Sequence, residues 1–107
     1  MMPTEAGAEL KRALRGYFVE LGAPVTVEAL ASRPWASITF AGERHRLALC
    51  LPGPGAAAAA DTFLDGLEER DFVLRGHILA DIEAIGVERD SDGQVRLVLD
   101  ALTVEDS

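Results

Sequence analysis

Three ionisable side chains lie at alternating positions of one strand-like segment, where they could carry out acid–base chemistry. Asp81 and Glu83 are two residues apart, which on a β-strand places them on the same face with a spacing of about 6.6 Å. This spacing would allow an acid–base pair, with Asp100 added from the neighbouring strand of a hairpin. His77 lies about 13 Å from Asp81 along the same strand, which is too far for a direct hydrogen bond between them.

The same set of three carboxylates and one imidazole also matches the ligands of a hard metal ion. A simpler interpretation is a partly solvated strand face, whose charges keep the strand from pairing with other chains. We favour this interpretation, and the sequence therefore predicts no catalytic residue, no cofactor and no metal site. An acid–base enzyme or small-ligand binder that uses the face of strand 77–83 remains the alternative.

Two short motifs match parts of known ligand sites but lack what those sites require. Residues 53–58 (GPGAAA) fit the G-x-G-x-x-A pattern of dinucleotide sites, but Pro54 removes one of the backbone N–H groups that would bind pyrophosphate. Residues 88–93 (ERDSDG) resemble the start of a calcium loop, yet the twelfth position holds Leu99 instead of a bidentate Glu. We therefore expect a flexible loop at 52–56 and a hairpin turn at Asp92-Gly93.

Composition excludes several classes of protein and site. The single cysteine, Cys50, rules out an intramolecular disulfide and multi-cysteine metal sites. A formal net charge of -8 argues against nucleic-acid binding, because phosphates would be repelled. No apolar stretch is long enough to span a membrane, and residues 1–10 lack the features of a signal peptide. We expect a cytoplasmic protein.

A chain of 107 residues is the usual size of one domain. We expect a single domain over residues 1–107, with flexible ends at 1–4 and 105–107. Apolar residues at helical spacing predict helices over 4–21 and 57–70. Alternating residues predict strands over 25–30, 35–40, 46–51, 72–88 and 95–104, with a break at Pro34 and a turn that contains Gly42.

The resulting order is α-β-β-β-α-β-β, in which an αββ unit is used twice with a break in the first copy. Short connections favour antiparallel pairing. The fold class is therefore α+β, with both helices packed on one face of an antiparallel sheet. We expect Ile78, Ala80, Ile82 and Ala84 to face the core, with Val95, Leu97, Leu99 and Ala101 opposite them.

The far face of the last hairpin mixes apolar and charged side chains, although a face covered only by water should be polar. This mixture predicts a ligand or partner surface made of His77, Leu79, Asp81, Glu83, Ile85, Val98, Asp100 and Leu102. A homodimer is the expected assembly, since twofold dimers are the commonest oligomers. An unknown protein partner is the alternative, and so is an apolar molecule held beneath Phe18, Phe63 and Leu67.

Overall fold

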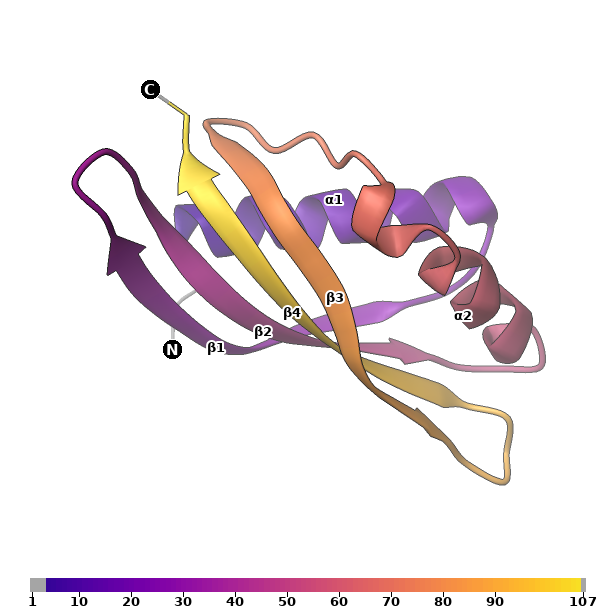
Figure 1. Ribbon diagram of the computed structural model, residues 1–107. Coiled ribbons are helices and arrows are strands. Elements are labelled where there is room, and N and C mark those ends of the chain that lie inside the picture. Colours follow the sequence, from indigo (N-terminus) through magenta and orange to yellow (C-terminus); the bar gives the residue numbers. More distant parts are fainter. Residues whose placement is uncertain (1–3, 107) are drawn as a thin grey trace.

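The computed structural model describes residues 4–106, which form two helices and a four-stranded antiparallel sheet (Figure 1). The elements follow the order α1 (Glu5–Leu21), β1 (Thr26–Ala36), β2 (Ala41–Leu51), α2 (Ala56–Leu64), the 3₁₀-helix η1 (Leu67–Glu69), β3 (His77–Arg89) and β4 (Val95–Glu105). The spatial order of the strands is β1-β2-β4-β3, and every neighbouring pair is antiparallel. The α+β class and the sheet expected from the sequence are confirmed.

Helix α1 begins and ends where the sequence predicts. The hydroxyl of Thr4 caps its first turn by accepting a 3.0 Å hydrogen bond from the backbone N–H of Gly7, and Gly22 ends it. Flexible ends were expected at 1–4 and 105–107. Of these residues, Thr4 caps α1 and Glu105 is the last residue of β4. Residues 1–3 and 107 lie outside the described residues.

Helix α2 is shorter than predicted and ends at Leu64. Gly66 adopts a left-handed conformation with φ of 71°, which side chains other than glycine rarely take up. The chain therefore turns there and continues as η1 instead of extending one helix to residue 70. Both helices lie on the same face of the sheet, as Figure 1 shows.

The prediction of two strands at 25–30 and 35–40 is wrong, because β1 runs without interruption from Thr26 to Ala36. Pro34 is tolerated because β1 is an edge strand, where a missing N–H can face solvent. The turn follows at residues 37–40, closed by a 2.7 Å bond from Ser37 N–H to the carbonyl of Phe40. The observed order is therefore α-β-β-α-β-β, which is the same arrangement twice.

Gly42 does not form the predicted turn but lies inside β2. A Cβ atom at this position would overlap the backbone oxygen of Thr103 and would lie 2.9 Å from Nε1 of Trp35. Glycine is therefore needed here because neighbouring atoms approach the backbone closely.

Strand β3 starts at His77 instead of Phe72 and carries two irregularities, at Ala80 and Ile85. Each adds one residue that has no partner on β4, so the side-chain alternation shifts by one position there. The prediction that residues 78, 80, 82 and 84 all face the core is wrong for this reason. Ile82 is only 2% exposed, whereas Ile78 is 53% exposed.

The core lies between the helices and the sheet. The rings of Phe18 and Phe63 are 5.0 Å apart, and Tyr17 contacts both of them edge-on. Both phenylalanines are fully buried. Aromatic side chains thus fill the space between the helices and the sheet, where a bound apolar molecule was one of the alternatives expected from the sequence.

Candidate functional site

Within residues 4–106, one face of the sheet has no helix over it, and we call this surface the open face. Cross-strand pairing in an antiparallel sheet places directly opposed side chains on the same side. The register therefore assigns to the open face Ala31, Arg33 and Trp35 of β1, Gly42, Arg44, Arg46 and Ala48 of β2, Val98, Asp100, Leu102 and Val104 of β4, and Ile78, Asp81 and Glu83 of β3.

The eight predicted site residues do not all share this face. Asp81 and Glu83 lie on it beside Leu102 and Asp100, their partners in the β3–β4 register, and Val98 follows along β4. His77 and Leu79 pair with Glu105 and Thr103, which places them on the helix side. The remaining residue, Ile85, is itself the unpaired residue of the second irregularity.

The irregularity at Ala80 is the physical reason for this separation. Without it, residues 77, 79, 81 and 83 would share one face, as strict alternation predicts. One extra residue between Leu79 and Asp81 turns the imidazole to the helix side and leaves the carboxylates on the open face. The four-membered set of His77, Asp81, Glu83 and Asp100 is therefore not brought together.

An ion pair joins the two central strands of the open face. The guanidinium of Arg46 donates two hydrogen bonds to the carboxylate of Asp100, at 2.8 and 3.1 Å. These bonds lower the pKa of Asp100 below its ordinary value, and Arg44 adds to this effect through its charge. They also raise the pKa of Arg46. The pair fixes both side chains in extended positions across the sheet.

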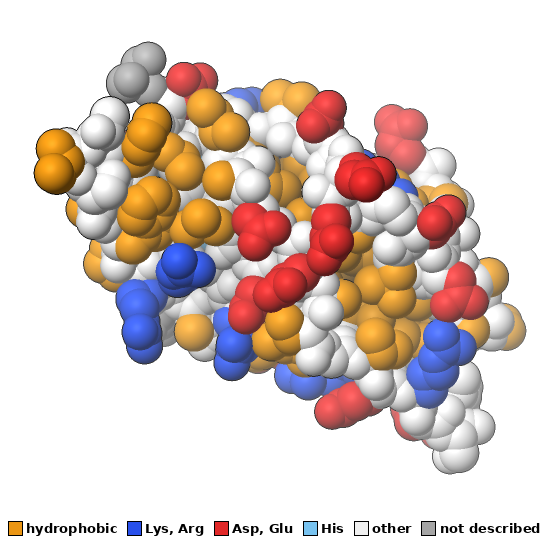
Figure 2. All heavy atoms as spheres, in the orientation of Figure 1, with side chains coloured by type: hydrophobic (Ala, Val, Ile, Leu, Met, Phe, Trp, Pro, Cys, Tyr) orange, Lys and Arg blue, Asp and Glu red, His pale blue; other side chains and the backbone are white. Residues whose placement is uncertain are grey.

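Charge is divided between the two halves of the open face over the rows from Ala31 to Trp35, although Glu28 of β1 and Arg96 of β4 lie further along the same face. Arg33, Arg44 and Arg46 come from β1 and β2, whereas Asp81, Glu83 and Asp100 come from β3 and β4. Together these six side chains line a shallow hollow of about 360 Å³. In Figure 2, acidic side chains run through the centre of the view and basic ones gather at its lower left.

A polar network on the helix side is the part of the structure that the sequence interpretation missed. His45 lies in β2 and is only 4% exposed. Its Nε2 atom is 2.9 Å from the hydroxyl of Thr103, and its Nδ1 atom is 3.4 Å from that of Ser32. Burial lowers the pKa of His45, although the charge of Glu43 opposes this effect and His77 adds to it.

The same network ties the start of α1 to the sheet. Thr4, the residue that caps α1, donates a 2.7 Å hydrogen bond to the carboxylate of Glu43. Thr103 in turn donates to the backbone oxygen of Glu43 at 3.4 Å. Alternation with Leu47, Leu49 and Leu51 was the signal that could have placed His45 on the buried face.

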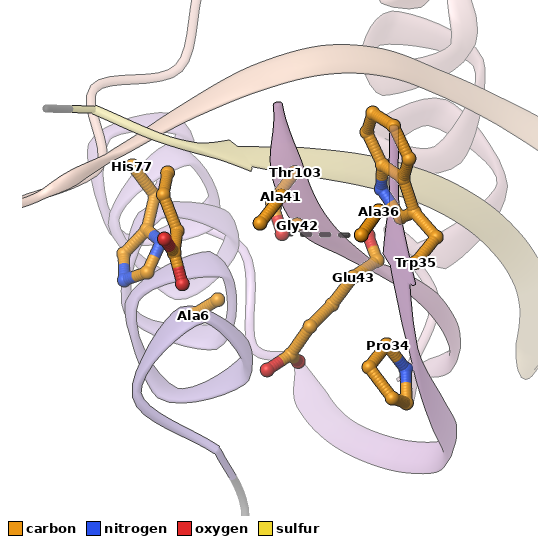
Figure 3. Close-up of a pocket in the computed structure, with 10 residues that line it drawn as sticks. Ala6, Pro34, Trp35, Ala36, Ala41, Gly42, Glu43, His77 and Thr103 are labelled. Atoms are coloured by element: carbon orange, nitrogen blue, oxygen red, sulfur yellow. Dashed lines mark hydrogen bonds between the residues drawn. The ribbon is translucent and has the colours of Figure 1, made fainter. Parts of the chain in front are cut away.

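A pocket of about 390 Å³ opens beside this network, at the end of the sheet (Figure 3). Ala6 and His77 lie on one side of it, Pro34 and Trp35 lie on the other, and the carboxylate of Glu43 reaches in between. The indole Nε1 of Trp35 is buried without a hydrogen-bond acceptor. The pocket therefore combines the carboxylates of Glu43 and Glu105 with the imidazole of His77 at an open rim.

Within residues 4–106, no three His, Cys, Asp or Glu side chains gather closely enough to hold a metal ion. Neither helix of that part of the chain has both the length and the apolar character needed to cross a membrane. No known protein family matches the chain, and no curated protein matches it in sequence.

Proposed function

We propose that this protein is a non-catalytic interaction domain that associates with itself through the open face. The observation that carries the proposal is the set of aliphatic side chains that the central strand β4 presents on the open face. Val98, Leu102 and Val104 are half-buried on a face over which residues 4–106 place no helix. An antiparallel sheet that faces only water normally carries polar side chains on that side, so a second chain is the natural cover for these side chains.

The charged side chains of the open face also support binding over acid–base catalysis. A general acid or base works best with a pKa near the operating pH. The carboxyl group of Asp100 has the opposite tendency, because Arg46 and Arg44 hold its pKa low. The imidazole of His77, which would complete an acid–base set, is on the other face.

Light scattering coupled to size-exclusion chromatography tests the proposal. At high micromolar concentration the chain should have a mass above the 11.4 kDa of one copy. Val98→Asp should return the mass to one copy, since a carboxylate in the interface would lose its hydration and the uncharged Ala48 and Gly86 lie directly opposite it in the sheet.

Val19→Asp is the matched control, because Val19 is an aliphatic residue of α1 that is 77% exposed and lies on the helix side. It should associate as the unaltered chain does. A strict monomer of the unaltered chain at high micromolar concentration would overturn the proposal.

A further inference from the structure

We infer that two copies pair open face to open face about a twofold axis that runs parallel to the strands, between β2 and β4. The inference rests on the proposed self-association and adds the geometry of the pair. It follows from how the side chains of the open face are arranged in rows across the four strands.

The rows follow from the strand register. The first row holds Trp35, Gly42, Val104 and Ile78, in the order β1, β2, β4 and β3. The second row holds Arg33, Arg44, Leu102 and Asp81, and the third holds Ala31, Arg46, Asp100 and Glu83. Within the second row, the basic side chains stand on one half of the sheet and the acidic one stands on the other.

Symmetry then decides which side chains meet. Rotation by half a turn about an axis parallel to the strands exchanges the two edges, so β1 lies over β3 of the partner subunit. Arg33 then faces Asp81 of the partner subunit, and the same contact occurs a second time by symmetry. An axis perpendicular to the strands would instead lay β1 over the same strand of the second copy and bring arginines together, which is repulsive.

The apolar residues of the first row match under the same operation, whereas in the second row Arg44 lies over Leu102 of the partner subunit. Trp35 faces Ile78 of the partner subunit, and Gly42 faces Val104 of the partner subunit. Ile78 is 53% exposed in the single chain, so a large ring over it removes apolar surface from water. The indole of Trp35 already lies close to Gly42, and Ala48 is fully buried in the single chain. Ala31 is exposed and small, and it leaves room there for the two sheets to approach to the usual distance of about 10 Å.

The size of the open face is sufficient for a stable pair. Four strands at a spacing of about 4.8 Å, over about 30 Å of paired length, give about 600 Å² in projection for each copy. Stable interfaces bury about 800 Å² of accessible surface on each partner, and side chains that project from the sheet add to the projected area. The strands of two packed sheets cross at about 30°. Arg33 lies in a row close to the centre of the sheet, and its long side chain can still reach the partner subunit when the strands cross at that angle.

Exchange of the two charges tests the inference. In Arg33→Glu, each introduced glutamate would face Asp81 of the partner subunit, and in Asp81→Arg each introduced arginine would face Arg33 of the partner subunit. Either variant alone should associate about tenfold more weakly than the unaltered chain. An equal mixture should form mixed pairs within about threefold of the original affinity, because every facing pair again has opposite charges.

Arg15→Glu and Glu20→Arg are the matched controls, since they make the same charge changes on exposed positions of α1. Each should self-associate normally, and their mixture should show no preference for mixed pairs. Analytical ultracentrifugation with one variant labelled by a fluorophore measures all of these affinities.

The outcomes separate the two proposals. A monomeric unaltered chain overturns the self-association and the geometry together. If the unaltered chain pairs and Val98→Asp abolishes the pairing, yet mixing Arg33→Glu with Asp81→Arg restores nothing, then only the twofold geometry is wrong. Preferential mixed pairs support both.

Discussion

The Nε2 atom of His45 lies 2.9 Å from the hydroxyl oxygen of Thr103, and both side chains are buried. The Thr103 hydroxyl donates to the carbonyl of Glu43, so its oxygen can accept from Nε2, while the hydroxyl oxygen of Ser32 lies 3.4 Å from Nδ1. We therefore assign the neutral imidazole with its proton on Nε2, which donates to Thr103, so that Nδ1 accepts from Ser32. This assignment leaves every polar atom of the imidazole and of the Thr103 hydroxyl with a partner.

Thr103→Val should destabilise the fold by about 1–3 kcal/mol, because it leaves the buried N–H of His45 without an acceptor. Thr103→Ser keeps the hydroxyl and should cost less, since only a methyl group is lost. Urea denaturation of both variants measures the difference. Equal losses of unfolding free energy in Thr103→Val and Thr103→Ser would show that the hydrogen bond contributes nothing measurable to stability.

Burial makes the free energy of unfolding depend on pH through His45. The folded pKa lies below the ordinary value of 6.5, so on acidification the unfolded chain takes up a proton before the folded chain does. The stabilisation is therefore complete above about pH 6.5 and is lost as the pH falls from there towards the folded pKa. Denaturation at pH 7.5 and at pH values below 6.5 should show this decrease.

The variant His45→Gln should be less stable at pH 7.5 but should lose less on acidification, because the titrating group is gone. His77→Gln removes the charge that adds to the lowering of the His45 pKa. Its loss of stability on acidification should therefore be smaller than that of the unaltered chain but larger than that of His45→Gln. A steep acid dependence in His45→Gln would assign the effect to other groups.

Two glycines should respond to alanine in opposite ways. At Gly16, on the exposed side of α1, a Cβ atom meets nothing within 4 Å, so Gly16→Ala should stabilise the fold by about 0.5–1 kcal/mol. At Gly42 a Cβ atom overlaps the Thr103 backbone, and Gly42→Ala should destabilise it by about 1–3 kcal/mol. Melting temperatures that move in the same direction for both variants would contradict the close approach at Gly42.

Salt should weaken self-association if Arg33 faces Asp81 of the partner subunit. Raising NaCl from about 0.05 to about 0.5 M shortens the screening length to a few ångströms and should reduce the association constant by about threefold to tenfold. Sedimentation at several salt concentrations measures this slope. Affinity that stays constant or rises with NaCl would mean that the aliphatic side chains of Val98, Leu102 and Val104 hold the pair without help from charge.

Sequence reasoning succeeded where the determining signals are local. The bounds of α1 follow from Thr4, Gly22 and the spacing of Leu10, Leu14 and Phe18, all within the same segment. The interpretation of Pro34 failed because its effect depends on whether the strand lies at an edge, which only the tertiary arrangement decides.

The candidate site was recovered in part for a similar reason. Asp81, Glu83, Val98, Asp100 and Leu102 share the open face as predicted, because regular alternation holds over those residues. The irregularity at Ala80 involves residues with no special backbone preference, so the sequence carries no sign of it, and it separates His77 and Leu79 from the rest. The irregularity at Ile85 is followed by Gly86, and a glycine inside a strand is a sign of such a feature.

The proline of β1 and the unpaired residues of β3 affect both edges of the sheet. A strand added at either edge would meet a missing donor or an interrupted ladder, which opposes growth by edge pairing. If the chain self-associates as proposed, the open face remains as the route of assembly, and a twofold pair covers it. Concentrated solutions should then contain particles that stop at two chains, and fibrils should be rare.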